Sequence, residues 1–374
     1  MHNEMSIKKY FVGIDLHSAK FNCCFLTDSN EKTESEFPVS SEGIQNFLKY
    51  AGKQSIVMVE ASTGSFEFVS RIKDHVKCVY VANPHKLKLI SMVKKKTDKI
   101  DAEKLAIFLK MQIMSGEELI KPVYVPEESI RILRSCFSNY RSLTNIIVQI
   151  KNNIHSIFKQ HLVNIPKNSL SAKTKREQYI DNYEFSETVK FQLKILFKQL
   201  KQTEENLSEI EDLIKLIGAD YYKEIEILTS MKGISLIMSL ALIADIASID
   251  RFPNSKHLTS YLRSAPSVDS SGKVTKIGKT NKFGRKLSVS LITQSVLHFR
   301  NANVQLNNWY ETKSKTKGRG KMRMAMMRKI FSQVYHMLSE QEYHWHRDEA
   351  NHLRKMKEYD NFLKRNGILI KDAA

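Results

Sequence analysis

Short apolar runs alternate with polar breaks along the first 84 residues of the chain. Runs typical of strands cover residues 10–15, 21–26, 55–60 and 78–82, and a further strand, third in chain order, ends at 36–38. Because that strand ends in Pro38, which cannot donate to a ladder, we expect it at a sheet edge. Residues 42–49 and 66–73 have helical patterns, and Asn83 followed by Pro84 favours the start of another helix. The order βββαβαβα predicts a mixed sheet with helices on its faces.

Residues 126–222 are polar but carry two apolar seams. The first seam is Cys136, Tyr140, Leu143, Ile147, Ile150, Ile154 and Ile157, and the second is Leu193, Leu196, Leu200, Leu207, Ile210, Ile214 and Ile217. Spacings of three and four, with Thr203 interrupting one position of the second seam, are the heptad pattern of long helices, and residues 164–169 separate the two. An antiparallel helical pair with coiled-coil character is predicted, which either packs on itself or joins two subunits.

The composition changes again after residue 222. Residues 223–340 contain an apolar helical stretch, most of the glycines outside the N-terminal part, and dense basic patches, whereas residues 341–374 are polar. We therefore divide the chain into an α/β region (1–125), a helical region (126–222), a mostly helical third region (223–340) and a polar tail (341–374) that forms a surface helix.

The net charge of the chain indicates which kind of molecule it binds. The 374 residues include 59 Lys and Arg against 40 acids, a formal charge of +19. A positive field of this size most often serves a polyanion such as nucleic acid. The longest apolar run, 234–244, is far shorter than the ~20 residues of a bilayer span, and the N-terminus lacks a signal-peptide pattern. We expect a cytoplasmic protein with a nucleic-acid partner and no membrane contact.

The cysteines are Cys23, Cys24, Cys78 and Cys136, and none forms a CxxC pair. This spacing argues against a zinc ribbon or finger. Because three of them lie within apolar runs, we expect buried, reduced thiols.

Acids of the first region fall where strands end or where a helix begins. Asp15 and Glu60 each end a predicted strand. Asp98 and Asp101 lie three apart at the start of a helix, on one of its faces. If the four converge, their mutual repulsion requires divalent cations, and hard oxygen ligands select Mg²⁺ or Mn²⁺, which activate a nucleophile in phosphodiester cleavage. The alternative is that each acid is a solvated strand end or, for Asp98, a helix cap.

Residues 225–252 predict two helices joined by a turn at Gly233. Such a turn is similar to a helix-hairpin-helix, in which glycine lets backbone amides approach a phosphate. A plain helical hairpin that ends in a glycine cap is the equal alternative.

A serine pair followed by glycine, Ser270-Ser271-Gly272, precedes a run of cations: Lys273, Lys276, Lys279, Lys282, Arg285 and Lys286. A hydroxyl among cations suits attack on phosphate, because the cations stabilise the charge that develops. No histidine lies close in sequence to act as base, so the carboxylates must supply that function, which requires that the two regions meet. By residue types alone, a Ser-Gly turn that only binds phosphates is favoured.

A second basic patch surrounds Gly318 and Gly320 and consists of Lys313, Lys315, Lys317, Arg319, Lys321 and Arg323. The glycines predict a flexible loop that follows a DNA or RNA backbone, with salt-dependent affinity. A helix is expected to follow over 324–337.

Motifs of the first region resemble the Asp-Glu-Asp-Asp signature of the insertion-sequence one-ten family of transposases, which includes the pilin-gene invertases. They are Gly13-Ile14-Asp15, Val59-Glu60-Ala61 with Gly64, Ala82-Asn83-Pro84 and Thr97-Asp98-Lys99-Ile100-Asp101-Ala102. The resemblance implies that 1–125 is a catalytic domain of the Holliday-junction-resolvase (RuvC-like) branch of the ribonuclease H fold.

Residues 223–340 resemble the family's C-terminal transposase domain through Tyr261-Leu262-Arg263-Ser264-Ala265-Pro266, Ser271-Gly272 and Lys282-x-Gly284. In that domain a serine before glycine is implied to form a covalent link to DNA, and this role falls on Ser271, with Ser270 as its nearest rival. The chain departs from the family pattern at Arg263-Ser264, usually Gly-Leu, at Arg285, usually asparagine, and at Ser288-Val289, usually leucine-arginine.

The resemblance also implies a bridge RNA that pairs with donor and target DNA, so that sequence choice lies in pairing. The chain is then a bacterial, nucleoid-associated recombinase. Since two sites must be cut in concert, we expect a dimer or tetramer. Two alternatives stay open: a resolvase-like nuclease that uses water while Ser271 only binds backbone, and a catalytically inactive nucleic-acid-binding protein.

Overall fold

The computed structural model describes residues 9–368 except for 85–97, 167, 172–175, 177, 272–273, 281–283 and 302. The chain divides into two compact units, Met1–Pro126 and Glu127–Ala374. Within the described residues, no helix combines the length and the apolar character that crossing a membrane requires.

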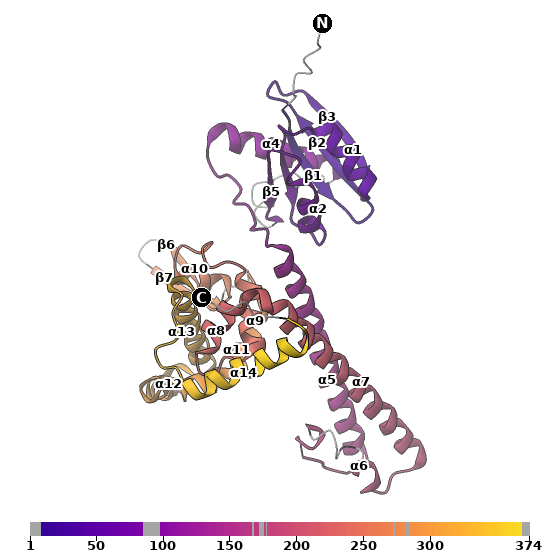
Figure 1. Cartoon of the computed structure of the whole chain (residues 1–374), viewed down its shortest axis with the longest axis vertical. Helices are drawn as coiled ribbons and strands as arrows, with labels where there is room; N and C mark the ends of the chain where they lie inside the picture. Colours follow the sequence, from indigo (N-terminus) through magenta and orange to yellow (C-terminus); the bar gives the residue numbers. More distant parts are fainter. Residues whose placement is uncertain are drawn as a thin grey trace. The chain divides into compact units, whose positions relative to one another are not determined.

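The first unit is built on a five-stranded mixed sheet in the order β3-β2-β1-β4-β5 (Figure 1). Its strands are β1 (Phe11–Leu16), β2 (Lys20–Leu26), β3 (Lys32–Pro38), β4 (Ile56–Glu60) and β5 (Cys78–Ala82). β2 pairs antiparallel with β1 and β3, whereas β4 pairs parallel with β1 and β5. The predicted strand order along the chain and the edge position of the proline-terminated strand are both confirmed.

Successive residues of a strand point to opposite sides of the sheet, and in this sheet both sides carry apolar residues. Helices therefore cover both faces. Val12 and Ile14 of β1 pack in one core with α1 (Ser41–Ala51) and α2 (Ser65–Ile72). Phe11 packs on the opposite face in a second core with α4 (Asp98–Ser115). Both α2 and α4 match predicted helices, while the helix expected after Pro84 lies outside the described residues.

All four cysteines are free thiols, as predicted. Cys23, Cys24 and Cys136 are buried, and Cys78 is half-buried. Burial raises the pKa of the Cys24 thiol to about 11, so at neutral pH it is protonated and a poor nucleophile.

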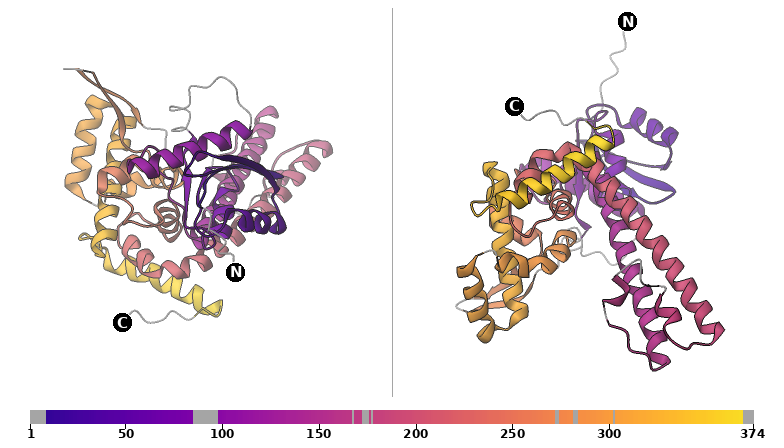
Figure 2. Two further views of the ribbon diagram at one scale, coloured as in Figure 1. Left: turned by 90° about the horizontal axis from the view of Figure 1, so that it is seen from above. Right: turned by 60° about the horizontal axis from the view of Figure 1, so that its bottom comes forward.

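Two long helices, α5 (Glu128–Gln160) and α7 (Glu187–Ile217), run side by side in the second unit, with the short α6 (Gln178–Asp181) between them in sequence (Figures 1 and 2). The pair is antiparallel, because Ile130 near the start of α5 shares a core with Ile214 near the end of α7. At the other end, Phe158 shares a different core with Leu193. The two predicted seams therefore meet within one chain.

The remaining helices of the second unit enclose one hydrophobic core. They are α8 (Tyr222–Thr229), α9 (Leu236–Ile246), α10 (Ser255–Tyr261), α11 (Leu287–Arg300), α12 (Val304–Lys317), α13 (Arg319–Glu340) and α14 (Glu349–Arg365). Every residue of α9 from Met238 to Ile246 is buried, so this apolar helix lies at the centre. The polar tail does form a helix, α14, and one of its faces is buried through His352, Met356, Tyr359 and Leu363.

The prediction of a flexible loop around Gly318 and Gly320 is wrong. Only Gly318 interrupts the chain there, with φ of 81°, and helices α12 and α13 flank it directly. Buried Tyr310 anchors α12 and buried Met322 anchors α13, so packing outweighs the low helix propensity of the glycines.

The structure also adds a β-hairpin for which the sequence analysis predicted no strands. Its strands are β6 (Pro266–Ser271) and β7 (Val274–Thr280), which pair antiparallel.

Candidate active site

Asp15 and Glu60 lie near or at the carboxyl ends of neighbouring parallel strands. The parallel register between β1 and β4 runs to the pair Ile14 and Val59, one residue before each acid. Residues two positions earlier, Gly13 and Met58, lie on the face covered by α4. Because side chains repeat every second residue, Asp15 and Glu60 belong to that same face.

Helix α4 runs antiparallel to β1 across this face. A Cβ at Gly13 would lie 2.0 Å from the carbonyl oxygen of Ala102, so the helix passes directly over this glycine. Further along α4, the ammonium group of Lys110 donates to the carbonyl oxygen of Thr27 at 2.8 Å, just beyond β2 and beside the start of β1. The beginning of α4 therefore lies toward the Asp15 end of β1.

The start of α4 carries the other two predicted acids. Asp98 is its first residue, and its side chain lies outside the described part of the structure. The Asp101 carboxylate accepts a hydrogen bond from Lys104 at 3.0 Å. Among the side chains that the structure describes, no three acids, cysteines or histidines form a metal-binding cluster. The structure thus brings together the elements that carry the four acids, and the completed ligand set remains a prediction.

His17 contacts this site and was missed by the sequence analysis. Its Nε2 lies 3.1 Å from Oδ2 of Asp15, whose side chain is 14% exposed. An imidazole N–H in this position orients the carboxylate. The signal in the sequence is weak, because it consists only of an acid near the end of a strand and a histidine two residues later, just beyond the strand.

Replacing Gly13 with alanine is expected to lower the free energy of unfolding of the first unit by about 1–3 kcal/mol or more. The added methyl group would meet backbone atoms, the Ala102 carbonyl oxygen at 2.0 Å and the Ala106 nitrogen at 2.4 Å, which cannot move without moving α4. Thermal unfolding followed by circular dichroism measures the effect. Gly64→Ala is the matched control, because its Cβ would meet only Leu16 at 3.7 Å. Equal melting temperatures for the two variants would contradict the close approach.

Ser271 lies in the second unit, as the last residue of β6 and next to the hairpin turn. It pairs with Val274, and Ser270 pairs with Thr275. The side chains of both serines lie outside the described residues, as do Gly272, Lys273 and Lys282. Lys276 and Lys279 lie on β7, again without described side chains.

The motif residues around this hairpin meet at its base. Gly284 has φ of 102°, and a Cβ there would lie 2.1 Å from the carbonyl oxygen of Tyr261. The same carbonyl accepts a hydrogen bond from the Arg285 backbone at 3.1 Å, and Arg263 Nε donates to the Gly284 carbonyl at 2.6 Å. Gly284 is therefore required for the chain to return from the hairpin close to the end of α10.

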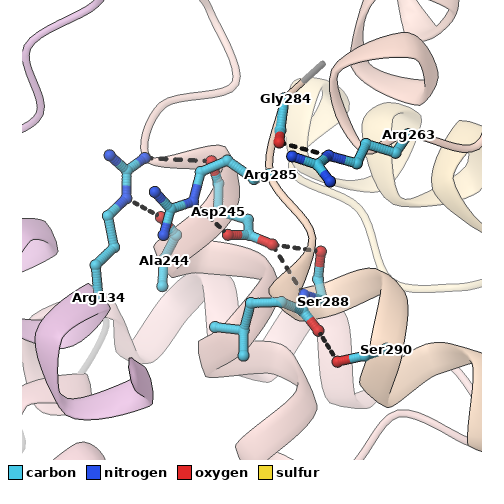
Figure 3. A network of polar contacts seen from close by, with 9 residues as sticks. Arg134, Ala244, Asp245, Arg263, Gly284, Arg285, Ser288 and Ser290 are labelled. Carbon is cyan, nitrogen blue, oxygen red and sulfur yellow. Dashed lines mark hydrogen bonds and ion pairs between the residues drawn. The ribbon is translucent and has the colours of Figure 1, made fainter. Parts of the chain in front are cut away.

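Arg285 binds a buried carboxylate within the protein (Figure 3). Its Nε donates to Asp245 Oδ1 at 2.6 Å, and the backbone N–H and hydroxyl of Ser288 both donate to Asp245 Oδ2 at 2.8 Å. Asp245 is fully buried. Arg134 of α5 reaches the same place and donates to the carbonyl oxygen of Ala244 at 2.7 Å. Arg285, predicted as a phosphate ligand, thus has an internal partner, while its neighbour Lys286 is exposed, and phosphate binding by these two residues stays a prediction.

Gly233 lies in the turn between α8 and α9, with φ of 95°. A Cβ there would meet the Phe299 ring at 3.3 Å, so the turn packs against α11. Lys355 of α14 donates to the carbonyl oxygens of Thr229 and Ile234 at 3.1 and 2.8 Å. These contacts hold the predicted turn in place, and phosphate binding by its backbone amides stays a prediction.

The α12–α13 junction gathers the cations of the second patch, which are all exposed: Lys313, Lys315, Lys317, Arg319, Lys321 and Arg323. Exposed cations at this junction of two helices are available to a phosphate backbone.

Two family models match the chain. A transposase model for the Asp-Glu-Asp-Asp proteins of the IS110 type matches residues 12–163, and the model of the IS116/IS110/IS902 transposase family matches residues 225–311. They cover the sheet with its acids and the hairpin with its serine, respectively. No curated protein matches the chain.

Proposed function

The chain belongs to the IS110 family of transposases, and we propose that it cuts and rejoins DNA through metal-bound carboxylates and a covalent serine–DNA intermediate. The coarse activity, transposition by cleaving and joining DNA, follows from the family. The sheet order, with three antiparallel strands leading into two parallel ones, supports a RuvC-like fold for the first unit.

The observation that carries the proposal is the convergence of Asp15, Glu60 and the start of α4 on one face of the sheet. Carboxylates are hard oxygen donors, and the Asp15 side chain is mostly shielded from solvent. We assign the metal ligands to Asp15, Glu60, Asp98 and Asp101. Magnesium or manganese bound there would polarise the scissile phosphate.

The chemical step that we propose uses the hydroxyl of Ser271. Its oxygen forms a bond to phosphorus as the bond from phosphorus to the 3′ oxygen breaks, and a 3′ hydroxyl is released. The serine loses one proton and the 3′ oxygen gains one, so no other reactant is consumed. Attack by a 3′ hydroxyl on the serine phosphodiester rejoins the strand, and the conserved bond energy removes any need for ATP.

Nucleic acid is held by the positively charged surface of the protein. The exposed cations of the α12–α13 junction and Lys286 bind phosphates of DNA and of a bridge RNA, which selects the sites by pairing. Because Ser271 and the acids lie in different units, a dimer or tetramer lets the serine of one copy complete the acid site of another.

The test is an adduct assay on the full chain. Protein, candidate flanking RNA, and labelled donor and target DNA are incubated with magnesium and then denatured. Label that migrates with the protein supports the serine mechanism. Cleavage without such an adduct would instead establish a resolvase-like nuclease that uses water, and no cleavage with any substrate would indicate a protein that only binds nucleic acid.

Removal of divalent cations is expected to lower adduct formation by at least about a hundredfold, because the acids alone cannot offset the charge that develops on the phosphate. Adding Mg²⁺ or Mn²⁺ after chelation should restore the adduct. DNA binding, measured by fluorescence anisotropy, should persist in chelator because Lys and Arg provide it. Full adduct formation in excess chelator would refute the metal site.

A further inference from the structure

A pocket of about 590 Å³ lies in the second unit, and neither the hairpin residues nor the four predicted acids are among the described residues that line it. The α8–α9 turn, the region around the start of α12, α13 and the segment 341–348 that leads into α14 line it. Aromatic rings on its wall come from His344, Trp345 and His346, and cations come from Lys232 and Lys329.

The segment that carries the rings is held in a defined position. The backbone N–H of Glu342 donates to the Met337 carbonyl oxygen at 3.0 Å. That of His344 donates to the hydroxyl of buried Ser230 at 2.9 Å. Asp348 then caps α14 by accepting from the Asn351 backbone at 3.2 Å. The pocket is thus formed in advance, which lowers the entropy lost on binding.

Trp345 is the dominant feature of this pocket, because 74% of it is exposed. A ring of this size exposed to water indicates a binding surface. One side of it stacks on His344, with ring centroids 5.3 Å apart and planes at 29°. His346 makes an edge contact with the same ring, with centroids 6.1 Å apart and planes at 84°. Because most of Trp345 is nevertheless exposed, the ring is accessible to another flat ring.

His344 extends this stack as a neutral ring with a defined proton. The His346 backbone N–H donates to Nδ1 of His344 at 3.3 Å, which places the proton of the neutral ring on Nε2. Burial also lowers the pKa of His344, so it does not add a charge at neutral pH.

Charge and polar groups around the stack fit a nucleotide. Lys232 and Lys329 are exposed cations, and no acid is among the described residues that line the pocket. Asn303, Gln305 and Gln333 also line it, and Asn303 Oδ1 accepts from the Leu306 backbone N–H at 3.1 Å as the cap of α12. Amides provide donors and acceptors for a base edge, and cations attract the flanking phosphates.

We propose that this pocket holds an unpaired base of a single-stranded nucleic acid, which stacks on Trp345 while Lys232 and Lys329 contact the adjacent phosphates. The inference rests on the proposed function to the extent that nucleic acid is the partner. Stacking of bases on aromatic rings tolerates any base and is strong enough to fix one nucleotide.

The experiment follows the fluorescence of Trp345. The chain has two tryptophans, so Trp309→Phe leaves Trp345 as the single reporter. Six-nucleotide RNA and DNA oligomers are titrated separately, and a third oligomer lacks one central base. We expect quenching by the intact oligomers and weaker binding of the abasic one. A preference for RNA would identify the guide as the source of the base, and a preference for DNA would identify the displaced strand.

Variants of the full chain test the stacking directly. Trp345→Ala should weaken oligomer binding, measured by anisotropy, by roughly 5- to 100-fold, whereas Trp345→Phe should keep most of the affinity. Phe191→Ala is the matched control, because Phe191 is an aromatic ring on α7 that is 66% exposed. Unchanged binding of the abasic oligomer or of Trp345→Ala would overturn the inference.

Failure of this inference differs from failure of the proposed function. In the Asp15→Ala variant, an oligomer should still quench the fluorescence of Trp345, because Asp15 lies in the other unit. Lost quenching with intact adduct formation would refute only the base pocket. Quenching without any adduct would refute only the serine mechanism.

Discussion

Ser271→Ala is expected to abolish the protein–DNA adduct and to lower strand exchange by a factor of roughly 10³ to 10⁶, the range found when a nucleophile of a catalytic unit is removed. Alanine has no hydroxyl to form the bond to phosphorus. Because Ser271 ends β6 beside the hairpin turn, the substitution should leave the fold intact, and an unchanged circular dichroism melting curve checks this. The adduct assay and a strand-exchange assay measure the loss.

Ser270→Ala is the matched control, since it removes the neighbouring hydroxyl on the same strand. It should retain adduct formation within a few-fold. If Ser270→Ala loses the adduct and Ser271→Ala keeps it, the nucleophile is Ser270. If neither substitution changes cleavage, water is the nucleophile and both serines only contact the backbone.

The acids should act as one unit with the serine. Asp15→Ala is expected to be as inactive as Ser271→Ala, and the double variant should be no worse than either single one, because residues of one catalytic unit are strongly non-additive. A double variant that is markedly slower than both would show two independent sites. This cycle tests whether acids of one unit and a serine of the other meet during the reaction.

Local periodicity was sufficient to predict the elements of the first unit. The position of Asp15 near the end of β1 follows from alternation, and that of Glu60 from the apolar run before it. The alternation of apolar and polar residues does not predict that α4 packs over Gly13. That contact is possible because glycine has no side chain. The contact of His17 with Asp15 likewise depends on the local course of the backbone after the strand.

Long-range partners limited prediction in the second unit. Arg285 stands among lysines in sequence and was assigned to phosphate, yet its partner Asp245 lies 40 residues earlier, in an apolar helix. At the α12–α13 junction a flexible loop was predicted because Gly318 and Gly320 lower helix propensity. Helices form there because buried Tyr310 and Met322 pack in the core, which the local pattern does not show.

Arg263, a position where the chain departs from the family pattern, has an unusual backbone conformation. The family usually has glycine at this position, and Arg263 here adopts φ of 53°, a left-handed conformation that glycine adopts without strain. Its side chain donates to the Gly284 carbonyl. This side-chain hydrogen bond offsets part of the strain that the left-handed conformation costs a residue other than glycine.

Asp245→Ala is expected to lower the free energy of unfolding of the second unit by about 3–5 kcal/mol, the effect of removing one partner from a buried ion pair. Asp245 is fully buried, and Arg285 is 34% exposed. The substitution leaves the Arg285 guanidinium and two donors of Ser288 without their acceptor. Chemical denaturation of the full chain, fitted for the transition of this unit, measures the loss.

The nearby Arg134 increases the loss of stability that we expect from Asp245→Ala. Burial, followed by the repulsion from Arg285, lowers the pKa of Arg134 to about 10, so Arg134 stays charged at neutral pH. Without Asp245, two cations face each other with no acid between them. Arg285→Ala in the Asp245→Ala background should therefore recover part of the lost stability, because it removes one of the unpaired charges.

Glu358→Ala is the control for loss of an ion pair as such. Glu358 is 64% exposed and pairs with Arg354 on the surface of α14, so its removal should change the free energy of unfolding by no more than about 1 kcal/mol. If Asp245→Ala were as mild, the network would be a surface contact and Arg285 would be available to phosphate after all. A large loss, with the hairpin activity falling in parallel, would mean that the buried carboxylate positions the strand that returns from Ser271.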